Sequence, residues 1–150
     1  MAKILISPSK YIQGPGELNR LGQYVEKLGK KALVLITESG YKRVGPGIEE
    51  GFKSSEASME VCYFNRECSK VEVDRIIDKY VKDDDCDIIV GVGGGKVADT
   101  AKAVALGIKY DGDVWDFFLG KAEAKGALPI GVITTIPASG SETSNASIIS

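Results

Sequence analysis

The sequence predicts a single α/β domain of the Rossmann-like type, with a parallel sheet that carries helices on both faces. Short, continuous apolar runs at 31–37 and 87–90 have the composition of strands that are buried on both sides. Between them lie segments whose apolar residues recur every three or four positions, which is typical of helices with one buried face. The 150 residues suffice for one such domain, which would bury roughly 70% of the surface of the unfolded chain.

Charge and cysteine content argue against several classes of function. The 19 basic residues are scattered and nearly matched by 21 acidic ones, so we expect no nucleic-acid partner. Met1 is followed directly by a predicted strand, with no signal peptide and no apolar run of membrane-spanning length, so we expect a cytoplasmic chain without a membrane partner. The three cysteines have no C-x-x-C spacing, which predicts neither disulfides nor a zinc site.

The first half of the chain alternates between strand and helix patterns. In order, we expect strands at 3–7 and 10–13, a helix over 17–28, a strand at 31–37, a helix over 41–53 and a strand at 58–64. Within 41–53, the triplet Gly45-Pro46-Gly47 is expected to separate a loop from the helix, because glycine and proline disfavour helix interiors.

The second half repeats the alternation. In order, we expect a helix over 70–82, a strand at 87–90, a helix over 96–106 and a strand at 128–135. Ser69 is the expected N-cap of the first of these helices, because Ser69 and Glu72 have the spacing of a capping box. The aspartates at 83–85 predict a solvated loop, with a metal-binding loop as the alternative. The aromatic residues at 115–118 predict either an apolar cover over the sheet edge or a partner surface.

The turn between the strand at 87–90 and the helix that starts at Lys96 is a candidate anion site. The glycines at 91 and 93–95 have no Cβ, so a ligand could lie directly against their peptide N–H groups. The first N–H groups of a helix lack partners and face the positive end of the helix dipole, which favours phosphate, and Lys96 adds a positive charge. The alternative is that these glycines only let the helix pack tightly on the strand.

Glu38 follows the strand at 31–37, and ligands of open α/β sheets bind beyond the carboxyl ends of the strands. An acidic side chain there can accept hydrogen bonds from ribose hydroxyls and repels a 2′-phosphate, so Glu38 predicts NAD in preference to NADP. The alternative is that Glu38 only stabilises the start of the following helix. The small-residue loop at 137–141 follows the last strand, and we expect it to face the same ligand as the glycine turn.

Two stretches resemble glycerol dehydrogenases, within the iron-containing (group III) alcohol dehydrogenase superfamily. Residues 93–102, GGGKVADTAK, resemble the GGGK-x-x-DTAK signature of these enzymes. Residues 7–14, SPSKYIQG, with Leu21-Gly22 further on, resemble their opening. On these motifs, residues 1–105 are similar to glycerol dehydrogenases.

The last third resembles a different branch of the same superfamily. Residues 113–118, 127–130 and 134–142 look like the butanol-type dehydrogenases, so residues 112–150 are butanol dehydrogenase-like. A resemblance that changes branch along the chain is expected of a chimeric or truncated chain, or of an intermediate natural member.

The resemblance implies hydride transfer between a nicotinamide and an alcohol carbon, with NAD as the cofactor. It implies that Gly94, Gly95 and Lys96 hold the pyrophosphate, that Glu38 holds the adenosine ribose, and that Asp99 points toward the nicotinamide or substrate side. The rival role for Asp99 is to stabilise the helix N-terminus. The full set of expected cofactor-binding residues is Glu38, Gly93, Gly94, Gly95, Lys96, Asp99, Thr134, Thr135 and Ser139.

In the family, an aspartate and two or three histidines from a helical C-terminal domain hold a divalent metal, zinc or iron. This chain contains no histidine, so no metal site can be carried over to it. We therefore expect residues 1–150 to be the NAD-binding domain of a metal-dependent alcohol or glycerol dehydrogenase, without its metal-binding catalytic domain and not catalytic alone.

Two alternatives remain open from the sequence. One is a relative of the dehydroquinate synthases, which share this fold, although the motifs at 7–14 and 93–102 fit them less well. The other is a non-enzymatic, engineered or self-assembling scaffold that keeps the ancestral site unused. An apolar face left uncovered by a missing domain would favour a homo-oligomer.

Overall fold

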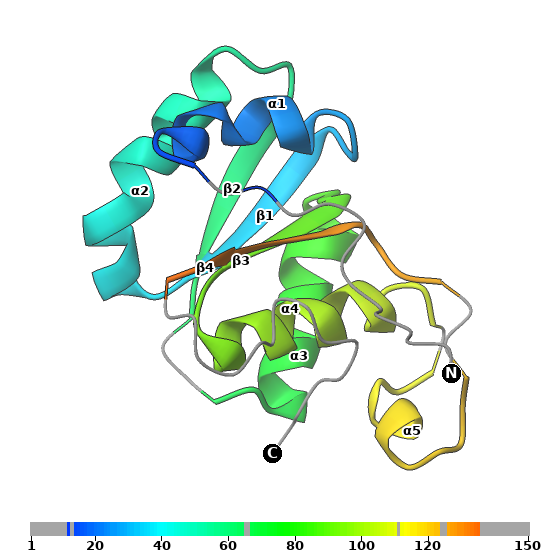
Figure 1. Cartoon of the computed structure of the whole chain (residues 1–150). Coiled ribbons are helices and arrows are strands. Elements are labelled where there is room, and N and C mark those ends of the chain that lie inside the picture. Colours follow the sequence, from blue (N-terminus) through cyan, green and yellow to red (C-terminus); the bar gives the residue numbers. More distant parts are fainter. Residues whose placement is uncertain (1–11, 13, 65–66, 111, 124–125, 136–150) are drawn as a thin grey trace, which may run out of the picture.

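A parallel sheet organises the computed structural model, which describes residues 12, 14–64, 67–110, 112–123 and 126–135 (Figure 1). Among these residues, four strands pair in the order β2-β1-β3-β4, and every pairing is parallel. The strands are β1 (Lys31–Ile36), β2 (Ser58–Tyr63), β3 (Ile88–Gly93) and β4 (Ile130–Thr134). This confirms the predicted α/β class and the predicted parallel sheet.

Helices cover both faces of the sheet, as predicted. The 3-10 helix η1 (Glu17–Arg20), α1 (Leu21–Val25) and α2 (Glu38–Lys53) lie on one face. The other face carries α3 (Lys70–Ile76), the π-helix η2 (Ile77–Asp83) and α4 (Gly95–Gly107). Figure 1 shows α1 and α2 on one side of the sheet and α3 and α4 on the other, with the short α5 (Trp115–Phe118) beyond them.

The central strands are apolar throughout because both of their faces are buried. Leu33 and Leu35 of β1 point into the core with α3 and α4, whereas Val34 and Ile36 point into the core with α1 and α2. All four side chains are completely buried. The strands predicted most clearly from their apolar runs are thus the two that hold the domain together.

The chain reverses its direction across the sheet between β1 and β3. From β1 it passes through α2 to β2, on one face. It then crosses over β1 through α3 and η2 to β3 and continues through α4 to β4, on the opposite face. Such a reversal opens a crevice at the carboxyl ends of the two strands where it occurs.

The triplet Gly45-Pro46-Gly47 does not separate a loop from a helix, so that prediction was wrong. Instead, α2 runs unbroken from Glu38 to Lys53 with Pro46 inside it. Gly47 and the nearby Gly51 serve tertiary packing: a Cβ on Gly51 would lie 2.6 Å from the carbonyl oxygen of Leu18, and one on Gly47 would lie 2.9 Å from the Leu18 side chain. These glycines let η1 approach the backbone of α2, which local propensity does not indicate.

Two other predicted helices change their geometry along their length. The helix predicted over 17–28 is η1 followed by α1, which ends at Val25. The helix predicted over 70–82 begins as α3 and continues as η2. Ser69 is confirmed as the N-cap of α3, since its hydroxyl accepts the amide of Glu72 at 3.3 Å. The predicted strand at 3–7 and most of that at 10–13 lie outside the described residues.

Candidate functional site

A cleft of about 510 Å³ lies at the carboxyl ends of β1, β2 and β3, where the chain reverses its direction across the sheet. Residues that follow all three strands line it: Thr37, Ser39, Phe64, Glu67, Gly94, Gly95, Lys96 and Val97. Because the order of the strands creates this crevice, its position is a property of the topology and not of any one loop.

The glycine turn forms one wall of this cleft. Gly93 has a φ of +145°, a conformation that only glycine adopts readily. Gly94 has an ordinary extended backbone, yet a Cβ built on it would meet no atom of the described residues within 4 Å. The described residues therefore leave room for a ligand on the Cβ side of Gly94, and α4 begins at the next residue.

The two interpretations of the glycines both apply, to different residues. A Cβ on Gly91 would lie 3.2 Å from the Cβ of Ala101 and 3.4 Å from the carbonyl oxygen of Val97, so Gly91 allows α4 to pack closely on β3. Gly94 makes no such close approach. Packing therefore accounts for Gly91 but leaves Gly94 unexplained.

The start of α4 differs from the starts of α2 and α3. Thr37 caps α2 by accepting the amide of Gly40 at 3.0 Å, and Ser69 caps α3 in the same way. The N-cap of α4 is Gly94, which has no side chain to supply such a bond. The first amides of α4 consequently have no side-chain acceptor at the cap, and they lie beside the cleft.

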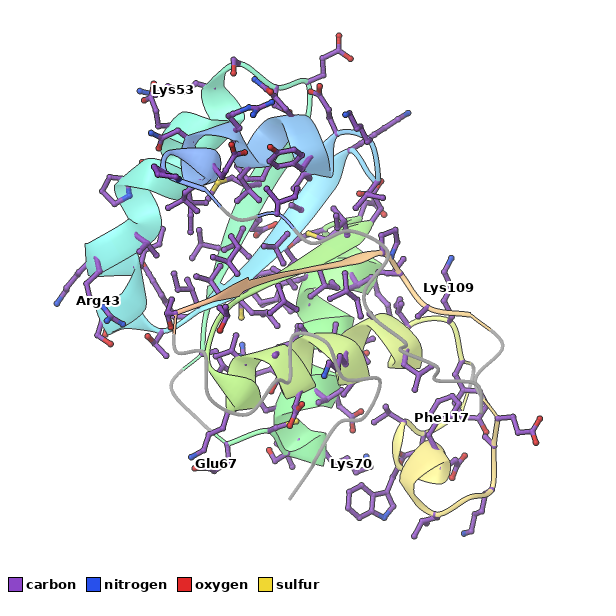
Figure 2. The ribbon with its side chains drawn as sticks, in the orientation of Figure 1. Arg43, Lys53, Glu67, Lys70, Lys109 and Phe117 are labelled. Atoms are coloured by element: carbon purple, nitrogen blue, oxygen red, sulfur yellow. The ribbon has the colours of Figure 1, made fainter. Side chains whose placement is uncertain are left out.

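Two charged side chains line the cleft among the described residues. Lys96, in the first turn of α4, forms an ion pair with Glu67, which follows β2. Both are largely exposed, at 65% for Lys96 and 62% for Glu67. Figure 2 shows Glu67 near the first turn of α4.

The structure brings only some of the predicted cofactor-binding residues to the cleft. Gly94, Gly95 and Lys96 line it, and Gly93 lies immediately before them. Glu38 is the exposed first residue of α2 and is not among the lining residues, although its neighbours Thr37 and Ser39 are.

The remaining predicted residues lie beside the cleft or outside the described part of the chain. Thr134 pairs in register with Gly93, and the amide of Thr135 donates to the carbonyl of Gly93 at 3.2 Å. Asp99 lies in the second turn of α4, where its mostly buried carboxylate is 3.7 Å from Lys102. Ser139 is outside the described residues.

The predicted set of site residues does not include five of the residues that line the cleft, namely Thr37, Ser39, Phe64, Glu67 and Val97. Phe64 ends the predicted strand at 58–64, so the rule that ligands bind at carboxyl ends of strands could have found it. Nothing in the local sequence marks Glu67, because the connection after β2 brings it to the start of α4.

The described residues do not provide a metal site. Within them, no group of three or more histidine, cysteine, aspartate or glutamate side chains could hold a metal ion. The whole chain contains no histidine. None of the helices in the described ranges is long and apolar enough to cross a membrane.

Comparison with known proteins gives a consistent family. Residues 8–150 match the family model described as iron-containing alcohol dehydrogenase. The chain is 35% identical over 146 residues to the probable NADH-dependent butanol dehydrogenase 1 of Bacillus subtilis, covering 95% of this chain and 38% of that protein. It is 34% identical to the glycerol dehydrogenase of Citrobacter freundii, covering 99% of this chain and 36% of that protein.

The fold agrees with a solved structure of the same kind. The crystal structure of NADH-dependent butanol dehydrogenase A from Thermotoga maritima superposes with a TM-score of 0.88 at 30% identity, covering 99% of this chain and 38% of that one. The relatives thus include both branches that the sequence motifs resemble. The chain spans somewhat more than a third of the length of these relatives.

Proposed function

The chain belongs to the iron-containing alcohol dehydrogenase family, and from this premise we propose that its cleft binds the pyrophosphate of a nicotinamide dinucleotide, with NADH preferred over NADPH. The chain would then be the nucleotide-binding part of an alcohol or glycerol dehydrogenase. When bound, the dinucleotide supplies a hydride donor or acceptor. The residues of this chain would bind and orient it.

The open space in front of Gly94 carries the proposal. That space lies at the switch point of the sheet, beside the start of a thirteen-residue helix that has no side-chain cap. Peptide N–H groups at such a helix start bind anions through hydrogen bonds and through the helix dipole. A diphosphate carries several acceptor oxygens and fits this requirement.

We assign the predicted residues to two sides of this diphosphate. The peptides of Gly93, Gly94 and Gly95 would approach its oxygens, and Lys96 would supply a positive charge. On the other side, Thr134 and Thr135 lie next to Gly93. These two residues would face the nicotinamide ribose together with Asp99, further along α4, and Ser139.

Glu38 would select the cofactor from its position at the start of α2. Its exposed side chain follows Thr37, which lines the cleft. A carboxylate there can accept hydrogen bonds from the adenosine ribose and repels a 2′-phosphate. Glu38 lies between two residues that line the cleft, Thr37 and Ser39. To reach the ribose, its side chain must turn toward the cleft.

No reaction step is assigned to a metal, because the described residues do not fit one. We propose that ligands for the family's metal come from a further helical domain. Without them, the 150-residue chain is expected to bind the dinucleotide without turning over an alcohol.

Titration of the chain with NADH, followed by calorimetry, tests the proposal. Gly94→Val places two methyl groups where the ligand should lie and is expected to weaken NADH binding about ten- to a hundredfold, since one or two charge-assisted hydrogen bonds are lost. Gly126→Val is the matched control, because a Cβ on Gly126 also meets no atom of the described residues within 4 Å. It lies in the segment before β4 and not in the cleft lining.

The NADPH titration tests the role of Glu38 separately. We expect NADPH to bind more weakly than NADH, and Glu38→Gln to reduce the difference. Equal NADH affinity in the Gly94→Val variant and the unaltered chain would overturn the proposed position of the pyrophosphate. The absence of NADH binding at millimolar concentration would overturn the proposed function of this chain.

A further inference from the structure

The ion pair between Lys96 and Glu67 joins two separate walls of the cleft. Most ion pairs of the described residues link positions three or four apart within one helix. This pair instead connects the segment after β2 with the first turn of α4, and both of its partners line the cleft. It therefore lies where the proposed ligand must enter.

A phosphate and the Glu67 carboxylate would compete for the same ammonium group. Lys96 has one charged head group, and its ion-pair partner among the described residues is Glu67. A phosphate oxygen that approaches Lys96 must displace this carboxylate or accept its repulsion at close range. Because both side chains are mostly exposed, the pair is screened by water and salt and can open readily.

We infer that Glu67 sets the affinity of the cleft for anions. Its carboxylate holds the ammonium of Lys96 before a ligand binds, and a phosphate oxygen takes that position only when Glu67 leaves it. The inference rests on the proposed function in one respect, namely that the anion is the pyrophosphate of the dinucleotide. Glu67 thus opposes anion binding, whereas its ion-pair partner Lys96 favours it.

The fold does not depend on this pair. Exposed ion pairs contribute little to stability, so the loss of Glu67 should leave the domain folded. The hydrogen bonds that fix the nearby backbone are made by other residues, such as the bond from the Thr100 hydroxyl to the Lys96 carbonyl at 2.8 Å. A change in ligand affinity on substitution of Glu67 can therefore be attributed to the binding site and not to a loss of folding.

The test is a double-mutant cycle on NADH binding, with inorganic pyrophosphate as a second probe. Glu67→Gln removes the competing charge and is expected to tighten binding of both probes about two- to fivefold, the range that the strength of exposed ion pairs gives. In a Lys96→Gln background, the same substitution should have no effect, because no ammonium is left to compete for. The gain should shrink as potassium chloride is added.

Glu50→Gln is the matched control. Glu50 also pairs through an exposed carboxylate with a lysine, Lys53, at 2.7 Å, but it lies in the last turns of α2 and not in the cleft lining. Both substitutions change the net charge by the same amount. Glu50→Gln is therefore expected to leave the affinity for either probe unchanged.

The outcomes separate this inference from the proposed function. Unchanged or weaker binding in Glu67→Gln would overturn the inference while leaving the proposed function standing. An equal gain with and without Lys96 would also overturn it, because Glu67 would then act through general charge. Pyrophosphate binding without NADH binding would defeat the proposed function, and the two variants would still decide the inference. If neither NADH nor pyrophosphate binds the unaltered chain or the Glu67→Gln variant, both the inference and the proposed function are wrong.

Discussion

The two ends of the sheet differ in whether the chain itself supplies an acceptor for the peptide N–H groups there. At the amino end, the Asp87 carboxylate accepts the amides of Lys30 and Lys31, each at 2.9 Å. The Lys31 ammonium in turn donates to the carbonyl of Asp84 at 2.6 Å. At the carboxyl end, the start of α4 has no such internal carboxylate at its cap.

This difference shows how one domain can have a stable amino end and, at its carboxyl end, peptide donors available to bind an anion. At the amino end the chain supplies its own anion, so the peptide donors there are satisfied and the strand starts are fixed. At the carboxyl end the corresponding donors lie beside a cleft and suit an anion from outside. Four predictions test this comparison, and they are ordered by the size of the expected effect.

Removing the internal anion should cost the most. Asp87→Ala leaves the amides of Lys30 and Lys31 without their acceptor and is expected to lower the free energy of unfolding by about 2–3 kcal/mol. Urea denaturation measures the change. Asp87→Asn keeps an acceptor oxygen and should lose less than the alanine variant. A stability equal to that of the unaltered chain would show that the amino end does not depend on this carboxylate.

A methyl group at the amino end should be the next most costly. A Cβ on Gly29 would lie 2.6 Å from Oδ1 of Asp87 and 3.0 Å from the Ile88 side chain, so Gly29→Ala must push the carboxylate away from its amides. We expect a loss of about 1–2 kcal/mol in the same denaturation experiment. Unchanged stability would mean that the Asp87 carboxylate can shift without losing its bonds to the amides of Lys30 and Lys31.

A glycine-to-alanine substitution at the carboxyl end, Gly94→Ala, should change the free energy of unfolding very little. The added Cβ of Gly94→Ala would meet no atom of the described residues within 4 Å, so the expected cost is that of poorer capping by alanine, less than about 1 kcal/mol. Its effect on NADH affinity should exceed its effect on stability. If Gly94→Ala destabilised the chain more than Gly29→Ala, the contrast between the two ends would be wrong.

The smallest expected effect is a pH dependence at the amino end. The Glu56 amide at 3.0 Å and the Ser55 hydroxyl at 2.9 Å both donate to the Glu26 carboxylate, and these bonds lower the pKa of Glu26 below its ordinary value. A carboxyl group whose folded pKa is lowered stabilises the fold above its unfolded pKa, and this contribution is lost as the pH falls through the folded pKa.

The melting temperature of the unaltered chain should therefore fall more steeply below about pH 4.5 than that of Glu26→Gln, which has no titrating group there. Thermal melts of both chains between neutral and acidic pH measure this. Parallel curves for the two chains would show that Glu26 contributes nothing to acid sensitivity.

The sequence predicts the fold better than the site, and the reason is the range of the interactions involved. The strands β1 and β3 are recognisable because burial on both faces requires continuous apolar residues. The unbroken α2 is not recognisable, since the reason for Gly47 and Gly51 lies in η1, a distant segment. The sequence analysis likewise predicts one helix over 70–82 and does not anticipate that its second half is the π-helix η2.

The candidate site divides in the same way. The glycine turn and Lys96 follow one another in the chain, so a motif can indicate them. Thr37 and Phe64 follow from the rule for carboxyl ends of strands. Glu67 reaches Lys96 only through the fold, so no local pattern predicts it. The roles of Glu38, Asp99 and Ser139 remain predictions, as do cofactor choice and self-association.

The crossover of the chain over β1 has a consequence for the timing of folding. β1 pairs with β2, its near neighbour along the chain, and with β3, which arrives only after α3 and η2 have crossed the sheet. Because loop closure delays long-range pairing, we expect β3 to dock late. The cleft is then completed in a late step, and a ligand that binds only the completed cleft should slow unfolding without speeding folding.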